Sequence, residues 1–118
     1  MKTLIYGGHV IDPANRVNSK LNLLVEDGRI VWIGTEMPDA DRRIDATGKL
    51  VTPGFIDIHM HEDPVQEGKI QQDIFLMMLR MGVTTAVGGN CGINVYDPGA
   101  YLNIVDKDGA AVNVALFA

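Results

Sequence analysis

Apolar and polar positions along the first fifty residues follow the short, turn-bounded pattern that is typical of β-strands. The clearest case is a pair of apolar runs, residues 21–25 and 30–33, on either side of Asp27-Gly28. An Asp-Gly pair supplies the positive φ angles of a tight turn, so the two runs predict a hairpin. The second run is apolar on both faces, which predicts a strand lying between two layers. Residues 1–50 are therefore expected to be all-β.

The pattern changes after Pro53-Gly54. Residues 55–58 form a nearly continuous apolar run, as expected for a strand that is buried on both sides. Apolar residues then recur at helical spacing, which predicts a helix whose methionines pack in the core and which ends at Gly82; they are Ile70, Ile74, Met77, Met78 and Met81.

Further apolar segments follow this helix. Residues 83–87 predict a strand, 101–105 a short helix and 111–118 a last strand. This order is typical of a parallel sheet with crossover helices, which opens either a doubly wound sheet or a (β/α)₈ barrel. The last strand is followed by no turn or polar tail, so we expect the chain to be truncated.

Composition narrows the functional classes. The net charge of −5 argues against a general binder of nucleic acid or of membrane surfaces, since both need clustered Lys and Arg. No apolar run approaches the roughly 20 residues of a membrane span, and the N-terminus has no secretory hydrophobic region. We therefore expect a cytoplasmic protein. The single cysteine excludes an internal disulfide.

His59 and His61 are the first candidates for chemistry. Two histidines at i and i+2 on a strand project to the same side, about 7 Å apart at their backbones, so both imidazoles can reach one metal ion. They follow the apolar run 55–58, at the strand end where ligands bind in α/β proteins. Taken alone, such a pair is a modest signal for a metal, because neighbouring histidines also occur as solvated loop residues or as hydrogen-bonded core groups.

Cys91 strengthens the case for a metal. It follows the next predicted parallel strand, and neighbouring strands lie about 4.8 Å apart, so a thiolate at 91 can reach an ion held by His59 and His61. Nitrogen and sulfur ligands suit zinc. Gly89 and Gly92 permit close backbone approach and unusual φ angles. The alternatives are a buried thiol and a cysteine nucleophile, which needs a histidine as its base.

Nearby polar residues have less defined roles. Glu62 and Asp63 are candidates to ligate metal, to orient a ligand imidazole or to contact substrate. Asp57 is interpreted as a structural hydrogen-bond acceptor, and His9 as a surface or structural residue.

Two segments resemble a known family. Residues 51–61, which end in Pro-Gly-Phe-Ile-Asp-Ile-His-Met-His, resemble the first barrel strand of the amidohydrolase superfamily, and residues 1–50 resemble its N-terminal β-sandwich segment. Residues 82–92, with Gly-Asn-Cys-Gly, are similar to the N-acyl-D-amino-acid deacylase (D-aminoacylase) branch, in which this cysteine is a metal ligand. The resemblance implies an α/β fold, with part of a composite β-sandwich in residues 1–50 and the first units of a TIM-like (β/α)₈ barrel in 51–118.

The resemblance also implies a function. A metal-activated hydroxide, formed on one or two zinc ions, is expected to hydrolyse the amide bond of N-acyl-D-amino acids or related amides in a homo-oligomeric enzyme. The family takes two further histidine ligands and a catalytic aspartate from later strands. No catalytic residue is therefore expected in residues 1–118, and this chain alone is expected to be inactive. Where these deacylases tend to have two aspartates, this chain has Glu62-Asp63.

Two alternatives stay open. Hydantoinases and dihydroorotases share the His-x-His strand but usually bridge their metals with a carboxylated lysine. The chain is also compatible with a small non-catalytic module that binds zinc or oligomerises through its strand edges.

Overall fold

The computed structural model describes residues 1–92 and 96–117, which form two compact units, Met1–Pro53 and Gly54–Ala118. The first unit contains the strands β1 (Lys2–Tyr6), β2 (His9–Asp12), β3 (Val17–Lys20), β4 (Asn22–Glu26), β5 (Arg29–Gly34), β6 (Arg42–Asp45) and β7 (Leu50–Val51). The second contains β8 (Phe55–Met60), β9 (Val65–Gln66), β10 (Lys69–Ile70), α1 (Asp73–Arg80), β11 (Val83–Gly88), α2 (Pro98–Asp108) and β12 (Asn113–Leu116).

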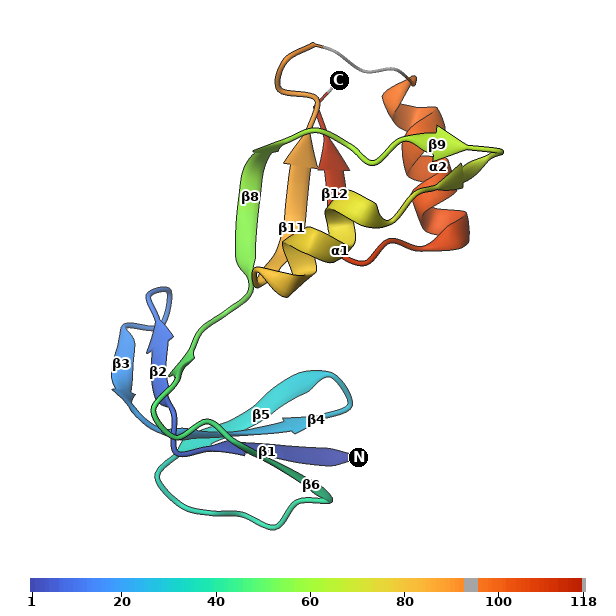
Figure 1. The fold of residues 1–118 in the computed structure, drawn as a ribbon. Helices are drawn as coiled ribbons and strands as arrows, with labels where there is room; N and C mark the ends of the chain where they lie inside the picture. The colour runs from blue at the N-terminus through green and yellow to red at the C-terminus, as the bar shows by residue number, and fades with distance from the viewer. Residues whose placement is uncertain (93–95, 118) are drawn as a thin grey trace. The chain divides into compact units, whose positions relative to one another are not determined.

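All regular elements that the structure describes in the first unit are strands, as the pattern predicted (Figure 1). A four-stranded sheet has the order β5-β4-β1-β6, and a three-stranded sheet has the order β3-β2-β7. The hairpin of β4 and β5 is confirmed: the strands pair antiparallel, and Asp27 and Gly28 have φ angles of 49° and 76°. Positive φ at both turn residues matches the twist of the two strands.

The prediction that the second arm of this hairpin lies between two layers is wrong for the described residues. β5 is the edge strand of its sheet, and Ile30, Val31 and Ile33 are 58%, 53% and 40% exposed. An apolar pattern reports that a strand favours burial, but the neighbouring elements decide whether it is buried.

The second unit is built on three parallel strands in the order β12-β11-β8 (Figure 1). α1 packs against β11, and α2 packs against β12 and β10. The predicted parallel sheet with crossover helices is therefore confirmed, and the chain is a sheet-dominated α/β protein. The core is formed by buried residues of all these layers: Met60, Ile70, Phe75, Met78, Ala86, Tyr101 and Val112.

The helix before β11 begins later than predicted and buries a different face. Ile70 lies in β10, and α1 starts at Asp73. Phe75 and Met78, one turn apart, face the core, whereas Met77 and Met81 are 60% and 65% exposed. Met77 is about 200° around the helix from Phe75, so the two cannot face the same layer. The prediction that these two methionines pack in the core is wrong. Gly82, with a φ of 87°, ends the helix as expected.

β8 also differs from the prediction of burial on both sides. Among the described residues it pairs with β11 alone, and Phe55, Ile56 and Ile58 are 57%, 65% and 69% exposed. Its C-terminal residue Met60 is buried in the core. Neither helix of the described chain is long and apolar enough to cross a membrane.

Candidate metal centre

The candidate ligands lie where two neighbouring parallel strands end. His59 is the second-last residue of β8, and His61 is the first residue after this strand. Cys91 lies in the turn after β11. Because β8 and β11 are adjacent and parallel, their C-terminal ends meet at the same edge of the sheet. The predicted cluster requires β8 and β11 to be neighbouring strands, and the structure confirms that they are.

The three side chains meet at this edge. Sγ of Cys91 is 3.5 Å from Nε2 of His59 and 3.9 Å from Nε2 of His61, and the three candidate ligand atoms all lie within 4.8 Å of one another. The two imidazole rings are tilted by 59°, and all three residues are exposed. In tetrahedral zinc sites, nitrogen and sulfur ligands lie about 3.6 Å apart. The donor set and its spacing therefore fit zinc, while the binding itself stays a prediction.

The turn that carries Cys91 has the backbone that its glycines predicted. Gly89 and Gly92 have φ angles of 83° and 64°, and the N–H of Gly92 donates to the carbonyl of Gly89 at 3.2 Å. Asn90, in the same turn, donates from Nδ2 to the carbonyl of Ile58 at 2.7 Å. Sequence reasoning assigned no role to Asn90, because its contact depends on the spacing of two strands that are remote in sequence.

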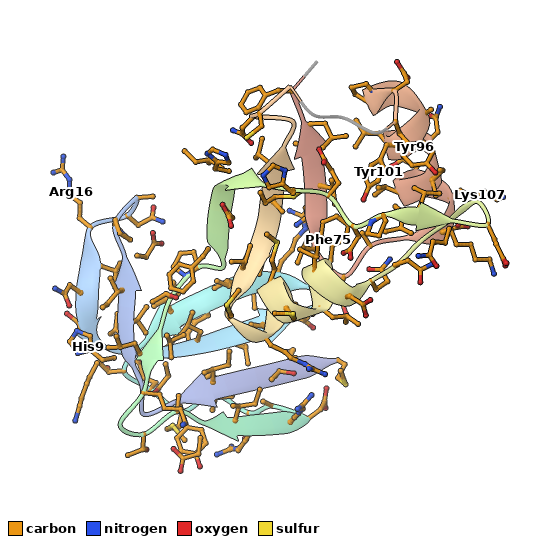
Figure 2. The ribbon with its side chains drawn as sticks, turned by 45° about the horizontal axis from the view of Figure 1, so that its top comes forward. His9, Arg16, Phe75, Tyr96, Tyr101 and Lys107 are labelled. Carbon is orange, nitrogen blue, oxygen red and sulfur yellow. The ribbon has the colours of Figure 1, made fainter. Side chains whose placement is uncertain are left out.

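Asp57 has the structural role expected of it, since its Oδ1 accepts the backbone N–H of His59 at 3.0 Å. His9 lies in β2 of the first unit (Figure 2). Its ring contacts the side chain of Asn18. The structure brings neither residue into the cluster of His59, His61 and Cys91.

Asp63 is an anchor for α1. Its side chain is fully buried, and its two oxygens accept the backbone N–H groups of Ile74 and Phe75 at 2.9 and 2.8 Å. These donors belong to the first turn of the helix, where backbone N–H groups have no partner within the helix and a negative charge is favourable. Both carboxylate oxygens thus bind backbone N–H groups of α1, a role that differs from the three considered for this residue from the sequence.

The carboxylate of Glu62 lies next to Gly88, the last residue of β11. A Cβ added to Gly88 would lie 2.7 Å from Oε1 of Glu62. This oxygen is buried and has no hydrogen-bond partner among the residues that the structure describes. It borders a cavity of about 180 Å³ that Tyr96 and Tyr101 also line. Figure 2 shows these two tyrosines at α2, the helix to which Tyr101 belongs.

Tyr101 ties α2 to this region. Its hydroxyl donates to the backbone carbonyl of Asp63 at 2.9 Å, and the residue is 3% exposed. Burial raises the pKa of the phenol well above its ordinary value, and the negative carboxylates of Asp63 and Glu62 raise the pKa further.

The raised pKa of Tyr101 predicts a loss of stability in alkali. Above pH 10.0, the ordinary pKa of tyrosine, the unfolded chain gives up this proton while the folded chain keeps it. The contribution to stability is therefore full below pH 10 and is lost as the pH rises further. Tyr101→Phe should flatten this dependence in urea unfolding followed by the helical circular dichroism signal between roughly pH 8 and pH 11. An unchanged alkaline slope in the variant would count against the assignment.

Comparison with known proteins adds to this geometry. A profile of the amidohydrolase family matches residues 42–112. The D-aminoacylase of Alcaligenes xylosoxydans xylosoxydans is 36% identical over 114 residues, which cover 91% of this chain and 23% of that protein. A dihydroorotase of Syntrophotalea carbinolica is 51% identical over 71 residues, or 58% of this chain and 17% of the relative.

Solved structures agree with these matches. The N-acyl-D-glutamate deacylase of Bordetella bronchiseptica, in complex with zinc and a phosphonate inhibitor that mimics the tetrahedral intermediate, superimposes with a TM-score of 0.81. It is 31% identical, and the match covers 98% of this chain and 29% of that one. The chain thus spans less than a third of the length of each of these relatives.

Proposed function

Because this chain belongs to the amidohydrolase family, we propose that it carries zinc ligands of an enzyme that hydrolyses the amide bond of N-acyl-D-amino acids or related amides. The observation that carries the proposal is the position of Cys91 Sγ, 3.5 and 3.9 Å from the Nε2 atoms of His59 and His61. Three exposed side chains that approach one another by chance could be of any polar type. Here they are one thiol and two imidazoles, the donors that zinc prefers.

In this proposal His59, His61 and Cys91 hold one zinc ion, or share in holding two. When bound, zinc supplies a Lewis acid that polarises an amide carbonyl and lowers the pKa of water to about 7. The chain's own part is to present two neutral imidazoles and a thiol that gives up its proton on binding. Asp57 supports His59 through the backbone and takes no direct part.

The choice of a deacylase over a cyclic amidohydrolase depends on Cys91. The match to the D-aminoacylase extends over both units of the chain, whereas the match to the dihydroorotase covers 58% of it. The higher identity to the dihydroorotase favours hydrolysis of a cyclic amide as the second candidate. A thiol at the shared edge of β8 and β11 supports the deacylase, because the cyclic amidohydrolases usually bridge their metals with a carboxylated lysine.

The wider setting is proposed on the same basis. The first unit is part of a composite β-sandwich, and the parallel strands of the second unit belong to a (β/α)₈ barrel. We place the whole enzyme in the cytoplasm as a homo-oligomer that acts on a small molecule, with no nucleic-acid or membrane partner.

The experiment compares zinc content and turnover. The 118-residue chain should bind zinc in elemental analysis, should lose it in Cys91→Ser and should hydrolyse no N-acetyl-D-amino acid, because the described residues place no carboxylate within the cluster. The whole protein should hydrolyse these substrates faster than dihydroorotate or hydantoin. The opposite preference would favour the cyclic amidohydrolase, and zinc binding without turnover in the whole protein would favour a non-catalytic module.

A further inference from the structure

The pairing of β8 with β11 contains an irregularity beside the metal centre. Two residues of β8, Ile58 and His59, lie between consecutive pairs of the ladder, whereas β11 has one residue there; the flanking pairs are Asp57 with Ala86 and Met60 with Gly88. Two residues opposite one define a β-bulge, which bends the strand and re-aims its side chains. The bulge includes one of the proposed zinc ligands.

The peptide group between Ile58 and His59 is held at both of its polar ends by side chains. Its carbonyl accepts from Nδ2 of Asn90 at 2.7 Å, and its N–H donates to Oδ1 of Asp57 at 3.0 Å. A peptide in a bulge has lost regular ladder pairing, so its orientation depends on such local partners. The two bonds fix the rotation of this peptide and with it the direction of the His59 side chain.

Asn90 connects the two halves of the cluster. It precedes Cys91 in the turn after β11, and the peptide that it binds precedes the α-carbon of His59 in β8. One hydrogen bond across 32 residues of sequence therefore sets the turn that carries the thiol relative to the strand that carries the imidazole. The distance of 3.5 Å between Cys91 Sγ and His59 Nε2 depends on that placement.

We propose that Asn90 and Asp57 are positioning residues that clamp the bulge peptide and so pre-organise His59 and Cys91 for zinc. The inference rests on the proposed zinc site. Neither side chain is a ligand: each acts through the backbone beside a ligand. Loss of such supporting hydrogen bonds typically lowers metal affinity about 10- to 100-fold.

The test uses Co²⁺ and Zn²⁺ binding by the 118-residue chain. Asn90→Ala should weaken the affinity for both ions about 10- to 100-fold. At saturating Co²⁺ it should also weaken the thiolate-to-cobalt charge-transfer absorption, which reports the bond from Cys91 rather than the stability of the fold. Asn90→Asp keeps the size of the side chain but loses the donor, so it should behave like the alanine variant.

A second pair of variants tests the other end of the peptide. Asp57→Ala should weaken metal binding in the same way, whereas Asp57→Asn keeps an oxygen acceptor for the N–H of His59 and should restore it. The circular dichroism spectrum reveals whether Asn90→Ala folds. If it does not fold, the two Asp57 variants alone test whether the clamp supports metal binding.

Asn113→Ala is the matched control. Asn113 also donates from Nδ2 to a backbone carbonyl of the neighbouring strand, that of Thr84 at 2.9 Å, in the same sheet but outside the cluster. This variant should bind Co²⁺ like the original chain. Original affinity and absorption in both Asn90→Ala and Asp57→Ala would overturn the clamp. Failure of the unmodified chain to bind either ion would instead overturn the zinc site itself, and the clamp with it.

Discussion

Replacing His61 by alanine is expected to lower the affinity of the 118-residue chain for zinc by more than about 100-fold, the upper range for loss of a group that only supports a ligand. His61 is one of three donors that lie within 4.8 Å of one another, and its removal leaves two. His59→Ala should have an effect of the same size, because both Nε2 atoms approach the thiol of Cys91. Competition with a coloured zinc chelator measures the change.

His9→Ala is the control for these substitutions. The chain has three histidines, and His9 belongs to the first unit, where its ring contacts Asn18. Zinc affinity should be unchanged in this variant. Equal losses in all three histidine variants would contradict a site at the ends of β8 and β11 and would indicate binding by histidine in general.

Asp63→Ala is expected to destabilise the second unit by about 3 kcal/mol, because it leaves two backbone N–H groups at the start of α1 without their charged acceptor. The residue is fully buried, so water replaces the carboxylate poorly. Both described helices belong to this unit, and urea unfolding followed by the helical circular dichroism signal therefore reports it. Zinc is left out so that metal binding does not contribute.

Asp97→Ala is the matched substitution at the other helix. Asp97 is the N-cap of α2 and accepts the N–H of Ala100 at 2.9 Å, but it is exposed. Its loss should cost about 1 kcal/mol, the usual effect of losing an N-cap. If Asp63→Ala were no more destabilising than Asp97→Ala, the buried carboxylate would not be the anchor of α1.

Local patterns predicted most of the elements. The Asp27-Gly28 hairpin and the end of α1 at Gly82 depend on backbone conformations that residues near in sequence impose. The order of strand, helix and strand predicted the parallel pairing of β8 with β11, because a crossover helix returns the chain in the same direction. Each of these features follows from a single continuous stretch of the sequence.

Burial was predicted less well. The apolar residues of β5 and β8 indicated strands covered on both faces, yet both strands lie at sheet edges in the described chain. In α1, the six consecutive apolar residues 74–79 suit more than one buried face, and the packing against β11 selected Phe75 and Met78 over Met77. Hydrophobic periodicity limits which faces can be buried, but the neighbouring layer selects one of them.

The sequence by itself determined the candidate ligands His59, His61 and Cys91, because each follows an apolar run and because imidazole and thiol are donors that zinc prefers. Only the tertiary structure decided how these ligands are supported. The sequence made Asp63 a possible ligand, whereas in the structure it anchors α1. Asn90, which had no predicted role, binds the bulge peptide. Both roles depend on backbone groups brought close by strand pairing and helix packing, and backbone groups are the same in every residue, so no sequence pattern marks them.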